Sequence, residues 1–285
     1  MNGRWVMALS LLAATSLASV RADSIAYQKA ILADKDVVGF WTFEDNFADQ
    51  TANKNDAKPG GKNPAAVTFV DGVNGGRAVH IDNPGGNGGS DGSFVEVNTP
   101  IGSIFDQAKF TILVWARNDN PAPATDDDQW NSLVDRNSLW YIELWSGDQD
   151  NTLGQNLVVR IYDPGNPTGG GTGQIGRHDV PIDDRTPFWA KKGEWHQYAM
   201  TYDGAKVTSY TDGKKMLQVD YDGGVGATAD TPTDPPHNNY NLTWGAWQQR
   251  GDWYTGAFDD TAYFKSAKTA DEIKAFYGAM LAKAQ

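Results

Sequence analysis

Beyond its first segment, the chain is a succession of short stretches rich in Val, Ile, Trp, Tyr and Phe, separated by Gly, Asp, Asn and Pro. Stretches of this kind are typical of β-strands joined by turns. The expected strands are residues 37–43, 67–70, 78–81, 94–97, 110–116, 140–145, 157–162, 195–202, 206–211, 216–221, 242–247 and 257–264. The pattern predicts an all-β fold in which two antiparallel sheets form a sandwich.

Helical patterns occur only near the two ends. Residues 24–32 favour a short helix, and a second helix is expected after Thr269, where Glu272 stands three residues on as in a capping box. Asp-Gly pairs at residues 203–204 and 212–213 have the composition of hairpin turns. No linker-like segment divides the chain, so residues 23–285 are expected to form one domain.

The charge balance excludes one class of partner. Asp and Glu number 36 against 24 Lys and Arg, which gives a net charge of −12. A surface this acidic repels phosphate backbones, so nucleic-acid binding is not expected. The chain has no cysteine, which excludes disulfides, thiolate metal sites and cysteine nucleophiles.

Residues 1–22 have the features of a signal peptide. Arg4 precedes an apolar stretch over residues 5–20, and Val20-Arg21-Ala22 fits the small residues that precede a cleavage site. Ser and Thr interrupt this stretch, which favours secretion over membrane anchoring, and no later segment reaches the ~18 apolar residues of a membrane span. The protein is therefore expected to be secreted or periplasmic after cleavage.

Four segments together resemble the LamG-like branch of the concanavalin A-like lectin/glucanase superfamily. They are residues 27–43 (YQKAILADKDVVGFWTF), 110–117 (FTILVWAR), 195–213 (WHQYAMTYDGAKVTSYTDG) and 256–277 (GAFDDTAYFKSAKTADEIKAFY). They follow one another in the family's order and bracket most of the chain. The resemblance implies a jelly-roll sandwich, but this fold hosts lectins, binding modules, adhesion domains, glycosidases and lyases.

The resemblance also implies a calcium ion near the neighbouring first and last strands. Asp45 and Asp49 follow the first expected strand, and Asp259 lies in the last one. Strand alternation is expected to place Asp259 and Asp260 on opposite faces, so only Asp259 is favoured as a ligand. Calcium requires six to eight hard oxygen ligands, which loop carbonyls would complete. The alternative interpretation is a solvated acidic edge.

Several aromatic and polar residues are candidates for binding a polysaccharide or glycan. Sugar rings stack on aromatic faces, while amide, carboxylate and guanidinium groups bind hydroxyls. The stretch from residue 247 to 254 mixes these residue types most densely. The candidate ligand-binding residues are Trp247, Gln249, Arg250, Trp253, Trp130, Trp189 and Arg160. For each tryptophan the alternative is packing at the edge of the sandwich.

Evidence for catalysis is weaker. The Glu-x-Asp-x-x-Glu run of glycosidases in this superfamily is absent, and Glu96 and Glu143 each stand alone in their strands. His178 beside Arg177 is a candidate base for a lyase, or an ordinary loop histidine. The sequence therefore predicts a secreted, calcium-stabilised carbohydrate-binding module without catalysis. The alternatives are a polysaccharide lyase or glycoside hydrolase with a non-standard site, and a structural or adhesion protein assembling through calcium or strand edges.

Overall fold

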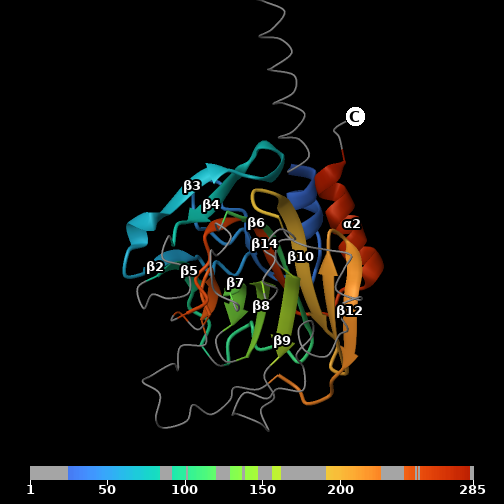
Figure 1. Ribbon diagram of the computed structural model, residues 1–285. Coiled ribbons are helices and arrows are strands. Elements are labelled where there is room, and N and C mark those ends of the chain that lie inside the picture. Colours follow the sequence, from blue (N-terminus) through green and yellow to red (C-terminus); the bar gives the residue numbers. More distant parts are fainter. Residues whose placement is uncertain are drawn as a thin grey trace, which may run out of the picture.

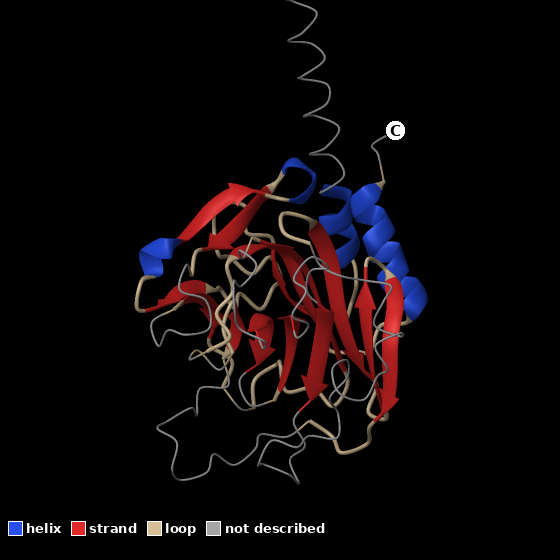
Figure 2. Ribbon diagram, in the orientation of Figure 1, coloured by secondary structure: helices blue, strands red, loops and turns tan. Residues whose placement is uncertain are grey.

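The computed structural model describes residues 25–83, 92–100, 102–119, 129–136, 139–146, 156–161, 191–225, 241–247, 249 and 251–282. The expected signal peptide, residues 1–22, lies outside these ranges. Two antiparallel sheets pack against each other, and helices lie near both ends of the described chain (Figures 1 and 2). This arrangement confirms the predicted sandwich with terminal helices. Among the described residues no helix has the length and apolar character needed to cross a membrane.

The larger sheet has eight strands. Its order is β12 (Lys214–Asp220), β11 (Lys206–Thr211), β10 (Trp195–Tyr202), β6 (Phe110–Asn118), β14 (Gly256–Phe264), β4 (Arg77–Ile81) and β3 (Val67–Asp71), and β1 (Val37–Trp41) also pairs with β14. The first and last strands of the chain are therefore neighbours, as the resemblance implied. Between β10 and β11, and between β11 and β12, the chain turns at the two expected Asp-Gly pairs. In the second turn both Asp212 and Gly213 have positive φ.

The smaller sheet has six strands. Its order is β2 (Lys58–Gly61), β5 (Ser93–Val97), β13 (Leu242–Trp244), β7 (Gln129–Arg136), β8 (Trp140–Ser146) and β9 (Asn156–Ile161). Strand β2 is not among the strands expected from the sequence. Its proline and two glycines are tolerated because β2 is an edge strand, where a missing backbone donor breaks no interior ladder.

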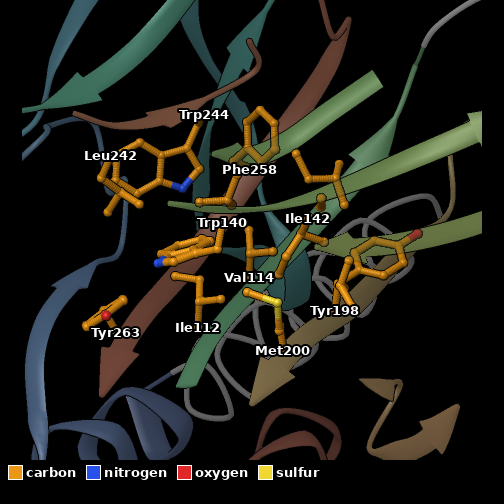
Figure 3. Packing of buried hydrophobic residues seen from close by; sticks show 14 of the residues in the cluster. Ile112, Val114, Trp140, Ile142, Tyr198, Met200, Leu242, Trp244, Phe258 and Tyr263 are labelled. Carbon is orange, nitrogen blue, oxygen red and sulfur yellow. The ribbon is translucent and has the colours of Figure 1, made fainter. Parts of the chain in front are cut away.

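The space between the sheets is filled by alternate side chains of both. Ile112 and Val114 of β6 and Met200 of β10 point into the same core as Trp140 and Ile142 of β8 (Figure 3). All five side chains are fully buried. Burial of a large apolar side chain contributes about 1.5–3 kcal/mol, so this core is the main source of the sandwich's stability.

A second apolar layer covers the outer face of the eight-stranded sheet. Helix α2 (Ala270–Leu281) and the helical residues 25–32 pack on this face (Figure 1). Phe276 of α2 stacks on Phe264 of β14 with ring centroids 5.5 Å apart. The helix starts with the predicted capping box, in which Thr269 and Glu272 each accept a hydrogen bond from the other's backbone N–H. Further 3-10 turns span Pro64–Ala66 and Val73–Gly75.

The expected alternation of Asp259 and Asp260 is wrong. The register between β14 and β6 shifts between Asp259 and Ala262, and Asp260 has a positive φ of 39°. This β-bulge adds a residue, so both aspartates contact the helix-covered side of the sheet. The Asp259 carboxylate accepts a hydrogen bond from the Val73 N–H (2.9 Å), and the Asp260 carboxylate accepts one from the Gln28 amide (3.2 Å).

Candidate functional site

The outer face of the six-stranded sheet carries a row of polar residues that crosses five strands. In the strand register Glu96 of β5 lies opposite Thr243 of β13, Thr243 opposite Asp135 of β7, Asp135 opposite Tyr141 of β8, and Tyr141 opposite Arg160 of β9. Their strand neighbours, among them Val95, Leu242, Val134, Ile142 and Val159, lie in the core. The five polar residues, called here the outer-face row, therefore point away from it.

Two of the candidate tryptophans lie beside this row. Trp130 of β7 and Trp247 are partly buried, and both pack against Tyr141 and Val158. The guanidinium of Arg160 lies over the Tyr141 ring, 5.5 Å from its centroid. The structure thus brings Trp130, Trp247 and Arg160, three residues far apart in the sequence, to one part of the sheet.

The other candidates have different surroundings. Trp253 is only 2% exposed and stacks on Phe94 with ring centroids 6.5 Å apart, so this arrangement gives it a packing role. Gln249 donates a hydrogen bond to the Glu96 carboxylate (2.7 Å), which ties it to the outer-face row. Trp189 and Arg250 lie outside the described residues, as do Arg177 and His178.

Trp247 is positioned by backbone pairing with Gly251, and the described residues between 247 and 252 are called here the 247–252 hairpin. Trp247 and Gly251 exchange backbone hydrogen bonds of 2.8 and 3.2 Å. Gln249 and Asp252 both adopt positive φ, at 60° and 49°. The Ser132 N–H donates to the Asp252 carbonyl (2.8 Å), which fixes the hairpin to β7. The hairpin thereby covers part of the outer-face row.

The hairpin also brings a second carboxyl group against the sheet. Glu143 of β8 and Asp252 share a hydrogen bond and are called here the carboxyl pair. Burial raises the pKa of Glu143 well above its usual value, and the charges of Asp252 and Asp135 raise it further, while Arg160 opposes them. Burial raises the pKa of Asp252 to about 6, although the hydrogen bond from Glu143 acts to lower it.

Some buried polar atoms of this face have no hydrogen-bond partner among the described residues. Oε1 of Glu143 and Oγ1 of Thr243 are buried and have no hydrogen-bond partner within the described part of the chain. Buried polar groups are nearly always satisfied by protein, water or ligand.

The sequence did not identify Glu143 or Asp252 as functional. Their partnership depends on the hairpin fold and joins two residues that are distant in the chain. One signal existed: strand alternation in WYIELW places Glu143 on the same face as Tyr141, opposite the apolar side chains of Trp140 and Ile142.

The predicted calcium ligands are not brought together. Asp49 is buried, and its carboxylate accepts hydrogen bonds from the N–H groups of Phe40 and Thr51 (3.0 and 2.9 Å) and from that of Asn55 (3.0 Å), so it organises its own loop. Asp45 pairs with Arg77 at 3.0 Å. In the described ranges no three His, Asp or Glu side chains form a group that could hold a metal ion. Calcium binding stays a prediction.

Asp259 has a different environment from the other two. Its Oδ1 is buried without a hydrogen-bond partner among the described residues. Burial raises its pKa well above the usual value, and the charges of Asp260 and Glu44 raise it further. Burial and the charge of Glu44 also raise the pKa of Asp260 above its usual value.

A pocket of about 500 Å³ lies elsewhere, at one end of the sandwich. Its walls include Leu139 after β7, Tyr202 at the end of β10, and Asp222, Gly224 and Val225 after β12. The Tyr202 hydroxyl accepts a hydrogen bond from the Gly224 N–H (3.2 Å). The described residues that line this pocket include none of the sequence-predicted binding residues.

Comparison with known proteins identifies the family. Residues 87–274 match the Laminin_G_3 model of the concanavalin A-like lectin/glucanases superfamily. This match covers more than half of the 285 residues, and the chain belongs to that family. Comparison with curated protein sequences gives no match.

Solved structures share the fold at low sequence identity. Domain 4 of AbnA, an extracellular arabinanase from Geobacillus stearothermophilus solved with arabinotriose, aligns with a TM-score of 0.52 and 16% identity, over 85% of this chain and 98% of that one. The binding domain of paraclostridial mosquitocidal protein 1 gives 0.56 and 17%, over 85% of this chain and 52% of that one. The binding domain of botulinum neurotoxin DC gives 0.57 and 13%, over 87% and 52%. The chain thus spans about half the length of the toxin domains.

Proposed function

We propose that the protein is an extracellular carbohydrate-binding module whose site is the outer face of the six-stranded sheet. The observation that carries this proposal is the placement of Trp130 and Trp247. Both pack against Tyr141 and Val158, beside a row of hydrogen-bonding groups. Aromatic faces next to carboxylate, hydroxyl and guanidinium groups provide the two kinds of contact that a sugar requires.

The structural neighbours support this proposal by analogy. The AbnA domain was solved with arabinotriose, and botulinum neurotoxin type C depends on two ganglioside molecules for cell entry. The AbnA enzyme is extracellular, which agrees with the secretion that the sequence of residues 1–22 predicts. At these identities the neighbours share the fold alone, so the ligand of this chain is inferred from its own residues.

The carboxyl pair favours binding over hydrolysis. Glycoside hydrolases separate their two carboxyl groups by about 5 Å or more, so that the sugar or a water fits between them. Glu143 and Asp252 are in direct hydrogen-bond contact, which leaves no such space. Incubation with polysaccharides is therefore expected to show no hydrolysis, measured as the release of reducing ends.

Assembly through strand edges, the remaining alternative, has less support. The edge strand β12 begins with exposed Lys214 and Lys215. Lysine on an edge strand discourages pairing with another chain. A monomeric elution volume in the presence and absence of calcium is the expected result.

Tryptophan substitution tests the site. A glycan array first identifies a glycan that the protein binds. Trp247→Ala and Trp130→Ala are each expected to weaken the free energy of binding to that glycan by about 1–3 kcal/mol, because the stacking face is lost. The matched control is Trp195→Ala, which removes another partly buried tryptophan, on the eight-stranded sheet beneath Arg117. Melting curves check that the variants fold.

Two results would contradict the site. Equal loss of binding in Trp195→Ala would show a general effect rather than a local one. Full binding by both site variants, together with loss in an Asp222→Ala variant, would place the ligand in the 500 Å³ pocket instead.

A further inference from the structure

Glu96 of β5 connects the smaller sheet to the segment that carries Trp247. We propose that Glu96 is a positioning residue, which holds the 247–252 hairpin in place and thereby fixes the Trp247 ring in the orientation that binds the glycan. This inference rests on the proposed function and adds to it a residue that sets the affinity without contacting the sugar. It follows from the hydrogen bonds of the Glu96 carboxylate and from the backbone conformation of the hairpin.

The Glu96 carboxylate accepts two short hydrogen bonds through one oxygen. Its Oε2 accepts one from the side-chain amide of Gln249 (2.7 Å) and one from that of Asn241 (2.7 Å). Its Oε1 lies 3.4 Å from Nζ of Lys58, and the Glu96 side chain is 14% exposed. Hydrogen bonds to a charged acceptor are roughly twice as strong as those between neutral groups. Glu96 therefore ties Gln249, and with it the hairpin, to β5.

The hairpin is anchored on both sides of the strand from which it extends. In the strand order, β5 and β7 lie on either side of β13. On the β5 side Gln249 is bonded to Glu96, and on the β7 side the Asp252 carbonyl accepts a hydrogen bond from the Ser132 N–H (2.8 Å). Loss of the Glu96 bond would leave the hairpin held from the β7 side.

The backbone of the hairpin requires such anchors. Gln249 and Asp252 have positive φ, 60° and 49°, a region that residues other than glycine rarely adopt. A conformation of this kind persists where the surrounding structure holds it in place. The Glu96 hydrogen bond acts directly on one of these two residues. Without it, we expect Gln249 to leave the left-handed region and the hairpin to sample other conformations.

Movement of the hairpin would change the position of Trp247. The backbone of Trp247 pairs with Gly251 in the same hairpin, and its ring packs against Tyr141 and Val158. A ligand that binds a mobile ring has to order it, and the entropy lost on ordering weakens binding. By fixing Gln249, Glu96 therefore increases the affinity of a site that the glycan contacts elsewhere.

Substitution of Glu96 tests the inference, with the full chain and a glycan selected on an array. Glu96→Ala removes both hydrogen bonds and is expected to weaken binding by about three- to ten-fold, because the ligand then has to order the hairpin. Glu96→Gln keeps a side-chain oxygen that can accept from both amides, and it is expected to retain most of the affinity. Lys58→Ala removes a partner of Glu96 outside the hairpin and is the matched control, with unchanged affinity.

A signal from Trp247 separates positioning from direct contact with the sugar. Fluorotryptophan is incorporated into the chain, and the fluorine NMR resonance of Trp247 is assigned by its absence from Trp247→Phe. In the ligand-free protein, Glu96→Ala is expected to shift or broaden this resonance, since the ring then samples several environments. Glu96→Gln and Lys58→Ala should leave it unchanged.

A second variant breaks the same hydrogen bond from the other side. Gln249→Met keeps the length of the side chain but removes its donor, and it should weaken binding and alter the Trp247 resonance as Glu96→Ala does. The double variant should lose little more than either single variant, because both remove one interaction. Gln249→Met also tests the inference if Glu96→Ala fails to fold.

Three results would overturn the positioning role. Unchanged affinity and an unchanged Trp247 resonance in Glu96→Ala would show that the hairpin does not depend on Glu96. An equal loss of affinity in Glu96→Gln would assign the effect to charge. Weaker binding with an unchanged resonance would mean that Glu96 contacts the glycan itself. If the unsubstituted protein binds no glycan, the proposed function fails, while the resonance in the ligand-free variants still decides whether Glu96 holds the hairpin.

Discussion

The outer face of each sheet carries a row of residues that includes polar side chains, but different elements of the chain cover the two rows. On the eight-stranded sheet Gln197, Trp115 and Asp259 lie opposite one another across β10, β6 and β14. Helix α2 and residues 25–32 bury this row. On the six-stranded sheet the 247–252 hairpin lies over the outer-face row, and Trp130, Trp247 and Arg160 remain partly exposed.

The apolar neighbours of each row explain the difference. The helix-covered face also presents Leu113, Ala199 and Phe264, which bury the apolar stripe of α2. On the other face the described buried apolar residues form only a small patch, with Tyr141 and Val158 in one cluster and Phe94, Ala246 and Trp253 in another. An amphipathic helix gains too little from so small a patch to dock there. One outer face is therefore packed beneath helices, while the other keeps Trp130, Trp247 and Arg160 partly exposed.

The largest expected effect is on the covered face. Phe264→Ala removes a fully buried ring that stacks on Phe276 and is expected to lower the free energy of unfolding by about 3–5 kcal/mol. Trp130→Ala, at a partly buried position of the other face, is expected to cost less than about 1 kcal/mol. Denaturant unfolding of both variants measures the difference, and equal losses would refute the distinction between the two faces.

The second effect concerns pH. The pKa of Asp252 in the folded protein is about 6, against 3.8 for the free side chain, so the folded state binds the proton more tightly. Such a carboxyl stabilises the fold fully below its unfolded pKa, and this contribution is lost as pH rises through about 6. Asp252→Asn is therefore expected to raise stability at pH 8 by on the order of 2 kcal/mol and to change it little at pH 4. A constant difference between the two pH values would contradict the raised pKa.

Features that depend on adjacent residues could be predicted from the sequence, whereas features that depend on residues distant in the chain could not. The capping box at Thr269 and the Asp212–Gly213 turn depend on adjacent residues and were predicted correctly. The faces of Asp259 and Asp260 were predicted wrongly, because a bulge depends on the partner strand and leaves no mark in the local alternation. Trp130, Trp247 and Arg160 were identified singly, but their common location depends on the strand order β13-β7-β8-β9. The carboxyl pair additionally requires the hairpin and could not be read from either residue's neighbours.

Calcium binding is still a prediction. A bound calcium ion is expected to lie on the helix-covered face of the eight-stranded sheet. A cation beside Asp259 and Asp260 would relieve the repulsion between two buried carboxylates. Calcium at a hundred-fold excess over its Kd would then stabilise the fold by about 2–3 kcal/mol, and a chelator would reverse the effect. Asp260→Asn is expected to reduce the calcium-dependent shift in Tm. An unchanged Tm of the unmodified protein in calcium and in chelator would exclude the ion.

The smallest effect separates stability from binding. Thr269→Ala removes the side chain that accepts a hydrogen bond from the Glu272 N–H at the start of α2 and is expected to cost about 1 kcal/mol of stability. Thr269→Ser, which keeps the hydroxyl, is the matched control and should retain most of that stability. Because α2 packs on the eight-stranded sheet, glycan affinity below the melting range is expected to stay unchanged in both variants. Weaker glycan binding by folded Thr269→Ala would mean that the two outer faces are coupled through the core, and the ligand site would then have to be sought nearer to the helix.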